Sequence, residues 1–534
     1  MTIHRHDVHW LAIYAVAILS FATSTRLAGA APSCTASCVA RMHACRAERC
    51  PTATGKDRRR CRDVCRAVTG CAAGAARTRT IATVVNECRS TGTPRQWTGR
   101  QRLEIRRGDC QPVTVVTIEA DVAAPDPLRI CEVYGRIRDG FAAQSVGVLE
   151  GVAVSPDGET VLFQLTDDFV GRLEVQGVKI ASPAFLLPDE GIFTVRSDGS
   201  DLRRIADQSS EAPFAVIPTT EFPFIAVPSK PTTGFSYSPD GKTVVYIDHG
   251  PGADGSVAPQ IFTLDPRNGA RRQLTAFTAS SIGTDPPDGI AMDALFLDDE
   301  QIGGYVFDSV EGNRILRIRR DGTDFHYVDV DPVSLPGAML VQTFRLAGLF
   351  NDVWALALDV QTEQPFAGAV REIFVRNGRN LLQLTNLGRS DTGFPIRSRG
   401  HEHVIFSASG DPLPGANPSL TCQLFSVDVL GRHLRQLTHF DPGVASSGGC
   451  ALATAEGCMV GAEVVVQDAA TGAIVFDSSC DPFGVRPVSQ QLYAVRPDGS
   501  GFRQVTGYRG MTVDPDGTVS VELPGPIVYQ ALFK

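Results

Sequence analysis

The sequence predicts an all-β protein, a β-propeller of six four-stranded antiparallel blades, with seven as the alternative count. Two strand-like runs joined by an Asp-Gly turn occur at 152–163 and again at 235–246. A companion strand–turn–strand phrase follows each of them, and its six copies lie at 192–205, 261–275, 314–322, 372–385, 423–438 and 491–506. Because one such sheet cannot bury both of its faces alone, repeats of this length indicate blades packed around an axis.

The turn of the first phrase consists of four residues, Ser-Pro-Asp-Gly, at 155–158 and 238–241. Proline presets φ for the second turn position, and glycine takes the left-handed conformation that a tight hairpin requires. The flanking runs alternate apolar and polar residues and favour β-branched and aromatic side chains, which is typical of strands. Each phrase therefore predicts a hairpin, and two hairpins in tandem make one blade.

A last hairpin-like stretch lies at 511–521 and has no companion phrase after it. The first hairpin of the middle blades is degenerate, but it can be traced at 294–307, 403–407 and 473–476. We therefore count six blades and expect the stretch at 511–521 to close the ring against the first blade.

Residues 1–30 have the features of a signal peptide. A weakly basic start at 4–6 precedes an apolar run at 10–21, and small residues at 28–30 supply a cleavage site. The apolar run is too short to span a bilayer comfortably. We expect a mature chain without a transmembrane anchor, located in the periplasm or secreted.

Cysteine usage agrees with export, since an even number of cysteines in an exported chain predicts a disulfide framework. Ten of the fourteen cysteines lie before residue 132. The disulfide candidates are Cys34, Cys38, Cys45, Cys50, Cys61, Cys65, Cys71, Cys88, Cys110, Cys131, Cys422, Cys450, Cys458 and Cys480. We expect a basic, disulfide-stapled helical hairpin at 31–110, a linker with leading strands at 111–142 and the propeller at 143–534.

Two pairs of these cysteines are spaced four residues apart, Cys34 with Cys38 and Cys61 with Cys65. On a helix this spacing places both sulfurs on one face. Two short helices would then face each other through crossed Cys34–Cys65 and Cys38–Cys61 bridges, and the next two cysteines along the chain would close the tip. A thiolate metal centre is the alternative. However, the Cys-x3-Cys spacing differs from the Cys-x2-Cys of zinc knuckles, so we expect no metal and no cofactor.

The remaining cysteines allow further bridges. Cys450 and Cys458 flank an expected hairpin and can pair with each other, which leaves Cys422 and Cys480 for a second bridge in the propeller. The candidates for longer-range bridges are Cys71, Cys88, Cys110 and Cys131, and the sequence leaves their connectivity open.

Charge divides the chain more sharply than its net charge of −9 suggests. Residues 31–110 hold 17 basic and 6 acidic side chains, whereas residues 111–534 hold 31 basic and 52 acidic ones. The basic segment either docks on the acidic propeller or holds the protein near anionic envelope polymers. Nucleic acid is not an expected partner, because the basic segment shows no interleaved aromatic platform.

The repeats resemble the six-bladed propeller of TolB-type periplasmic proteins over roughly residues 143–530. The resemblance is clearest where the Ser-Pro-Asp-Gly turns and the Leu-Thr endings recur, at 152–163, 235–275, 423–438 and 491–506. It implies a soluble cell-envelope scaffold that binds other proteins and performs no chemistry of its own. The chain departs from TolB before the propeller, where TolB carries a small α/β domain and this chain carries its cysteine-rich segment.

Motifs of catalysis are missing from the sequence: it has no Gly-x-Ser-x-Gly elbow, no phosphate-binding loop and no dinucleotide fingerprint. His401 and His403 attract attention as a metal pair, but we favour a loop or channel-mouth position without metal. The acidic residues at 285–300 lack the ordered spacing of a calcium loop, so we favour a solvated linker. Phe222 and Phe224 lie in a proline-rich apolar connection that either contacts a partner or extends a blade.

These observations predict an exported, monomeric, non-enzymatic scaffold that binds another protein or an anionic envelope polymer through its inter-blade loops. The alternative is a secreted enzyme of the polysaccharide lyase or esterase type, with its site at the mouth of the channel. Convergence of the two histidines or the carboxylates at 285–300 within ligand distance of each other would favour the enzyme.

Overall fold

A computed structural model of the chain supplies the coordinates. The residues that it describes are 34–51, 54–69, 79–91, 96–108, 110–119, 149–165, 174–175, 178–179, 191–207, 215–217, 225–227, 235–278, 290–308, 312–328, 339–350, 353–361, 370–377, 380–387, 395–396, 403–440, 460–467, 473–483, 491–508, 510–513, 515 and 519–529.

Six four-stranded antiparallel sheets, which we number one to six in chain order, make up most of the described chain. The first three consist of β4 (Leu149–Val154), β5 (Thr160–Leu165), β8 (Gly191–Arg196) and β9 (Arg203–Ala206); β12 (Ser236–Tyr237), β13 (Val244–Pro251), β14 (Val257–Leu264) and β15 (Arg271–Gln273); and β16 (Ile290–Phe296), β17 (Gln301–Asp308), β18 (Gly312–Arg319) and β19 (His326–Val328). The last three consist of β20 (Met339–Phe350), β21 (Val353–Gln361), β22 (Val370–Asn377) and β23 (Asn380–Gln383); β24 (Pro395–Ile396), β25 (His403–Ala408), β26 (Gln423–Asp428) and β27 (Arg435–Gln436); and β28 (Val460–Gln467), β29 (Ile474–Ser478), β30 (Gln491–Val495) and β31 (Arg503–Gln504).

A five-stranded sheet joins segments from the two ends of the chain. Its strands, in spatial order, are β3 (Val113–Glu119), β2 (Gln96–Arg107), β1 (Thr80–Thr91), β33 (Val519–Tyr529) and β32 (Gly510–Val513). Two short hairpins, β6 (Glu174–Val175) with β7 (Val178–Lys179) and β10 (Ala215–Ile217) with β11 (Ile225–Val227), stand outside these sheets.

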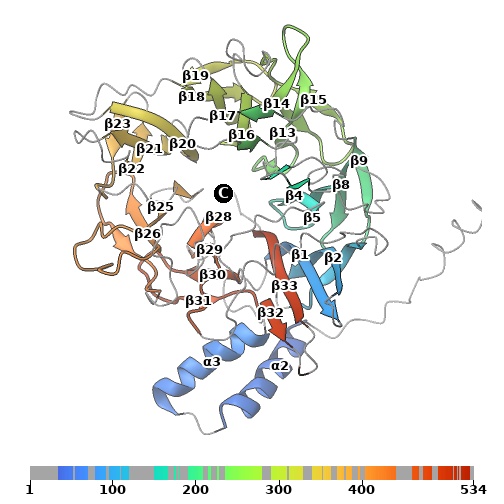
Figure 1. Cartoon of the computed structure of the whole chain (residues 1–534), viewed down its shortest axis with the longest axis vertical. Helices are drawn as coiled ribbons and strands as arrows, with labels where there is room; N and C mark the ends of the chain where they lie inside the picture. Colours follow the sequence, from blue (N-terminus) through green and yellow to red (C-terminus); the bar gives the residue numbers. More distant parts are fainter. Residues whose placement is uncertain are drawn as a thin grey trace, which may run out of the picture.

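The all-β propeller is confirmed, because the sheets follow one another around a common centre (Figure 1). Five of the companion phrases supply the last two strands of a four-stranded sheet, and the copy at 314–322 supplies β18 and the turn before β19. The stretch at 511–521 does not pair with the first sheet; it forms β32 and part of β33, and β33 pairs with β1. Residues 80–107, which we assigned to the cysteine-rich segment, form β1 and β2 of the same sheet. Their alternating apolar residues outweigh the nearby cysteines.

The hydrophobic core lies between neighbouring sheets. Strand β1 shows why the five-stranded sheet fits between the sixth sheet and the first. Ile81 packs in a cluster with residues of the sixth sheet, whereas the next residue, Ala82, and then Val84 pack with residues of the first sheet. Because successive strand residues point to opposite faces, one strand serves both interfaces. Arg106 and Tyr508 add hydrogen bonds across the join to the sixth sheet: Arg106 donates to the Val505 carbonyl at 3.0 Å, and the Tyr508 hydroxyl donates to Thr83 at 2.6 Å.

A buried side-chain network explains the Leu-Thr ending of the companion phrase. In the fifth sheet, Gln423 Oε1 accepts hydrogen bonds from the Thr438 hydroxyl at 2.8 Å and from the Phe440 backbone N–H at 3.0 Å. Thr438 Oγ1 in turn accepts from the Leu424 N–H at 2.9 Å. The same arrangement, which we call the Gln–Thr latch, recurs as Gln260 with Thr275, Glu372 with Thr385 and Gln491 with Thr506.

The glutamine before the Leu-Thr pair completes each latch. Its side-chain amide donates to the carbonyl of the latch threonine, at 2.6 to 2.8 Å, from Gln273, Gln383, Gln436 and Gln504. A threonine carbonyl at the outer strand would otherwise lose a hydrogen bond on burial, which is unfavourable. The repeated Gln-Leu-Thr or Gln-Val-Thr ending is therefore a hydrogen-bonding unit.

The turns confirm the chemistry that the Asp-Gly pairs predict. Gly158 and Gly241 have φ of +74° and +70°, in the left-handed region. In the companion turns, the hydroxyl of the residue two positions after the aspartate donates to the carboxylate. These hydrogen bonds hold the pKa of three exposed carboxyls, Asp198, Asp321 and Asp498, below the usual value.

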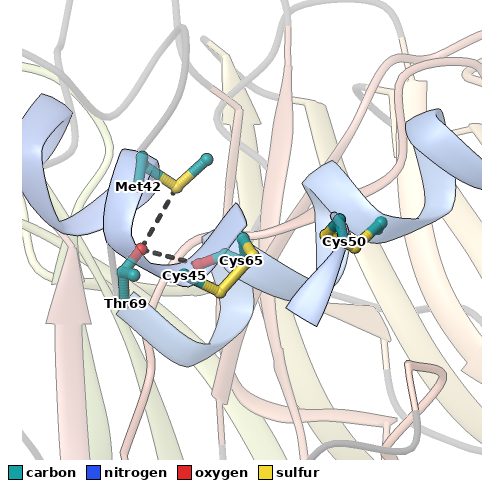
Figure 2. The surroundings of a disulfide bond; sticks show 6 residues. Met42, Cys45, Cys50, Cys65 and Thr69 are labelled. Carbon is teal, nitrogen blue, oxygen red and sulfur yellow. Dashed lines mark hydrogen bonds between the residues drawn. A yellow bond between two sulfur atoms is a disulfide. The ribbon is translucent and has the colours of Figure 1, made fainter. Parts of the chain in front are cut away.

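Two antiparallel helices, α2 (Cys34–Arg49) and α3 (Gly55–Thr69), form the expected disulfide-stapled hairpin, but the sulfurs pair differently from the prediction. The bridges join Cys45 to Cys65 and Cys50 to Cys61, so the predicted Cys34–Cys65 and Cys38–Cys61 pairs are wrong. α2 continues to residue 49, so the two cysteines nearest its end, Cys45 and Cys50, pair across the connection with Cys65 and Cys61, and the earlier Cys34 and Cys38 do not. The Thr69 hydroxyl donates to the Cys65 carbonyl at 2.7 Å beside the first bridge (Figure 2).

No cysteine is free among the described residues. Cys38, Cys110, Cys422 and Cys480 are disulfide-bonded as well, and the last two lie in one buried cluster between the fifth and sixth sheets. Cys71, Cys88, Cys131, Cys450 and Cys458 have no described side chain, so their expected bridges lie outside the described residues. No helix within the described ranges is long and apolar enough to cross a membrane.

Removing one latch hydroxyl should destabilise the protein measurably. Thr438→Val leaves the buried Leu424 N–H without its acceptor, so we expect the free energy of unfolding to fall by about 1–3 kcal/mol. Thr263→Val is the control, because Thr263 is also buried but its hydroxyl makes only a 3.5 Å contact. Urea unfolding monitored by fluorescence gives both values. Equal losses in the two variants would contradict a special role for the latch.

Tryptic digestion without reduction should identify the bridges of the hairpin. Cleavage after Arg46, Arg60 and Arg62, among other sites, separates the four cysteines into different peptides. We expect residues 42–46 to be linked to 63–66, and residues 50–56 to 61–62. Mass spectrometry distinguishes these products from a linked peptide that contains Cys34 and Cys65, which would restore the pairing predicted from sequence.

Candidate functional site

A cavity of about 240 Å³ lies between the first and second sheets. We call it the inter-sheet pocket. It is lined by both Ser-Pro-Asp-Gly turns, by the end of β8 and the start of β9, and by the turn between β14 and β15. Its lining includes Asp157, Thr194, Arg196, Tyr237, Asp240 and Arg267.

The two Ser-Pro-Asp-Gly turns form adjacent walls because they pack against each other. A Cβ at Gly241 would lie 3.5 Å from Pro156 Cδ, which is ordinary van der Waals contact. Within each turn the serine hydroxyl donates to the aspartate: Ser155 to Asp157 at 2.6 Å, and Ser238 to Asp240 at 2.7 Å. The repeated phrase thus positions one carboxylate from each sheet at the pocket.

The turn between β14 and β15 forms a third wall, held by a close approach of two backbones. Gly269 has φ of +75°, and a Cβ placed there would lie only 1.7 Å from the Ile205 carbonyl oxygen of the first sheet. Only glycine permits this contact, which brings Arg267 to the pocket. Gly269 therefore sets the distance between the two sheets at this point.

Most charged groups around the pocket already have partners. Arg267 binds Asp265 through two hydrogen bonds of 3.0 and 2.8 Å. Asp240 Oδ2 lies 3.2 Å from Lys242 Nζ and 3.5 Å from an Arg320 nitrogen. Burial opposes ionisation of Asp240, but hydrogen bonds from Ser238 and Lys242 outweigh it and hold the pKa below its usual value. Asp201 and Arg203 form a longer, exposed pair at 3.8 Å.

Two hydroxyls at the pocket have no hydrogen-bond partner among the described residues. Tyr237 is 4% exposed and Thr194 is 2% exposed, and the oxygen of each is buried and unpaired. Burial, together with the nearby Asp157 carboxylate, raises the pKa of Tyr237 far above its usual value. Tyr237 is therefore a neutral phenol that can both donate and accept a hydrogen bond.

The structure does not bring the sequence-predicted binding residues to this pocket. Phe222, Phe224 and His401 lie outside the described residues. His403 begins β25 in the fifth sheet, is partly buried, and has a buried Nδ1 without a hydrogen-bond partner in the described part of the chain. Its partner across the strands is Asp428, which the His433 ring nitrogen Nδ1 contacts at 2.9 Å.

The acidic residues at 285–300 do not gather into a ligand set as far as the structure describes them. Asp298 accepts backbone hydrogen bonds in its own turn, Asp299 accepts from the Asp240 N–H at 2.8 Å, and Glu300 pairs with Arg320 at 2.8 Å. Of these contacts, the one between Asp299 and Asp240 joins the second and third sheets. Asp285 and Asp288 lie outside the described residues.

Only one group of three or more metal-ligating side chains occurs among the described residues, and it lies in the helical hairpin. The ligand atoms of Cys50, Cys61 and Cys65 lie within 4.8 Å of one another. All three sulfurs are held in the two disulfides (Figure 2 shows the bridge to Cys65). In this form they are not available as thiolates.

Sequence reasoning missed the pocket residues, although one signal was present. Tyr237 occupies the position that Val154 holds in the first copy of the Ser-Pro-Asp-Gly phrase, so a polar group replaces an apolar one at a core position. Arg196 carries no such signal, because Arg496 occupies the same place in the last companion phrase.

Comparisons with known proteins find structural similarity but no family. No family model matches the chain, and no curated protein matches it. Similar solved structures include the propeller domain of the trilobed protease from Pyrococcus furiosus, with a TM-score of 0.38, 11% identity and coverage of 69% of this chain and 90% of that chain. An oligogalacturonate lyase from Vibrio parahaemolyticus gives a TM-score of 0.40, 10% identity and coverage of 75% and 85%. TolB from Acinetobacter baumannii gives a TM-score of 0.30, 11% identity and coverage of 80% and 79%. TolB is thus one of several β-propeller proteins to which the chain is similar.

Adding a methyl group at Gly269 should push the two sheets apart. Gly269→Ala places Cβ inside the Ile205 carbonyl, so we expect a loss of about 4 kcal/mol or more in unfolding free energy. Gly255→Ala is the matched control: it has a similar φ of +81° but open space around it, and should cost only about 1–2 kcal/mol for its left-handed backbone. Equal costs, measured by urea unfolding, would show that the close approach does not exist.

Proposed function

We propose that the chain is an exported, non-enzymatic propeller scaffold of seven blades, which a basic helical hairpin attaches to an anionic envelope polymer. The six four-stranded sheets and the five-stranded sheet are the seven blades of this proposal. The loops between blades remain available for a protein partner. The observation that carries the proposal is the concentration of exposed arginine on the hairpin.

The hairpin combines high charge with an exposed position. Residues 34–69 include nine basic and three acidic side chains, a net charge of +6. Arg58 and Arg62 are exposed and lie four residues apart on α3, so they share one face of the helix. Arg49 is exposed at the end of α2. Figure 1 shows both helices at the edge of the ring beside β31 and β32, and α3 contacts β31.

Disulfides support export and explain how so polar a hairpin stays folded. Exposed helices of 16 and 15 residues with low mean hydropathy bury little apolar surface of their own. Two bridges, Cys45–Cys65 and Cys50–Cys61, restrict the unfolded hairpin and compensate for the small core. Such bridges persist in oxidising compartments. A rigid surface of arginines suits electrostatic attachment to polyanions.

Binding in place of catalysis is supported by the arrangement of the polar groups that the structure describes. Asp298 and Asp299 accept backbone hydrogen bonds and Glu300 pairs with Arg320 of its own sheet, and His403 lies in a different sheet from the pocket. Nothing in the part of the chain that the structure describes favours the alternative of a lyase or an esterase.

Charge reversal on α3 should weaken binding of the full chain to anionic vesicles. Each basic residue near an anionic surface contributes about 1 kcal/mol, so Arg58→Glu with Arg62→Glu should weaken binding at least about 30-fold. Sedimentation with vesicles that contain anionic lipid, against neutral vesicles, measures the effect, and added salt should reduce binding of the unchanged protein.

The control for this experiment makes the same charge change on the propeller. Arg432 and Arg435 are exposed around the turn between β26 and β27, so Arg432→Glu with Arg435→Glu changes net charge equally. It should leave binding nearly unchanged. Binding that is indifferent to salt, or an equal loss in both double variants, would refute attachment through the hairpin.

A further inference from the structure

The inter-sheet pocket retains unsatisfied polar groups after its internal pairs are counted. Arg267 binds Asp265, and Asp201 pairs with Arg203. Asp240 lies close to both Lys242 and Arg320. Two charged groups remain less engaged: Arg196, which forms no ion pair with a described residue, and Asp157, which uses only Oδ1 for its contacts with Ser155 and the Glu159 N–H. The unpaired hydroxyls of Tyr237 and Thr194 lie beside them.

We propose that the inter-sheet pocket binds a small zwitterion of the amino-acid class. The ligand's ammonium group would contact Asp157, its carboxylate would contact Arg196, and the Tyr237 hydroxyl would complete the hydrogen bonding. This inference concerns a different surface from the helical hairpin and does not depend on polymer attachment.

Charge balance favours a zwitterion over a simple ion. The pocket is lined by three aspartates and three arginines, so its charged groups sum to zero: Asp157, Asp201 and Asp240 against Arg196, Arg203 and Arg267. A ligand with one net charge would gain from one set and be repelled by the other. A molecule that carries both charges satisfies the opposed groups together, with charge-assisted hydrogen bonds at each end.

Size and burial point to the same class of ligand. A cavity of 240 Å³ is smaller than the range of about 300–1,000 Å³ typical of sites for drug-sized molecules. A buried hydroxyl without a partner is unfavourable, and phenylalanine at position 237 would avoid that loss while filling nearly the same volume. The tyrosine is therefore explained if a polar molecule reaches its oxygen.

Position 496 shows what Arg196 would do in a purely structural role. Arg496 occupies the same place in the companion turn of the sixth sheet, where its guanidinium contacts the Ser500 hydroxyl at 3.5 Å. Ser200 occupies the equivalent position after Arg196 and donates to Asp198 at 2.6 Å, as Ser500 does to Asp498, but no contact to Arg196 accompanies it among the described residues. Among the described residues, no side-chain hydrogen bond within this turn therefore fixes the Arg196 guanidinium.

Calorimetric titration of the full chain tests the proposal with a defined set of probes. The zwitterions are L-alanine, L-glutamate, L-lysine, L-phenylalanine and the dipeptide alanyl-alanine. For the zwitterion that binds best, the N-acetyl form removes the ammonium charge and the amide removes the carboxylate. We expect at least one zwitterion to bind with Kd below about 1 mM, and both blocked forms to bind at least about tenfold more weakly.

Variants then locate the site. Arg196→Gln should weaken binding of that zwitterion about tenfold or more, and Tyr237→Phe about fivefold. Neither should lower the unfolding midpoint, since Arg196 is exposed and the Tyr237 hydroxyl has no partner to lose. Arg496→Gln is the control and should bind normally. The proposal is overturned if no zwitterion binds, if the blocked forms bind equally well, or if Arg496→Gln produces the same loss as Arg196→Gln. Water alone would then fill the pocket.

Discussion

The Gln–Thr latch is the interaction on which the geometry of four of the sheets depends. Their outer strands are short: β27 and β31 have two residues each, β15 has three and β23 has four. Backbone ladders of that length hold a strand weakly. The latch adds side-chain bonds that are buried from water, where each is stronger and where its loss would leave a donor unpaired. Through this network a two-residue strand keeps a fixed register, and the loops that follow it leave the ring in a fixed direction.

The join between the two ends of the chain is the second constraint. The five-stranded sheet places β1 and β33 side by side, and Ile81 and Ala82 pack toward opposite neighbours. A propeller sheet needs an apolar face on each side, and these adjacent residues provide one each. The Tyr508–Thr83 and Arg106–Val505 hydrogen bonds fix the angle at which the last four-stranded sheet meets this join. The position of the basic hairpin at the edge of the ring has the same cause, because α2 and α3 directly precede β1 in the chain.

The repeated phrases predicted the propeller and all six four-stranded sheets, since turn chemistry and alternation are local properties that a sequence displays directly. The strands β1 to β3 were assigned to other segments because they carry no repeated phrase and lie among cysteines. The disulfide pairing was wrong because it depends on how the two helices align across their connection, which the spacing of four residues alone does not determine. The pocket escaped prediction for a different reason: Asp157, Arg196 and Tyr237 are far apart in the sequence, and only the packing of two sheets brings them to one cavity.

The five-stranded sheet also governs the order in which the protein can mature. Strand β33 lies far downstream of β1 in the chain, and until the two strands pair β1 has an unprotected edge. A ring of this kind cannot be completed on a partly synthesised chain, and its longest-range contacts form only after loop closure across almost the whole polypeptide. Removal of β32 and β33 would leave the backbone N–H and C=O groups at the edge of β1 unpaired.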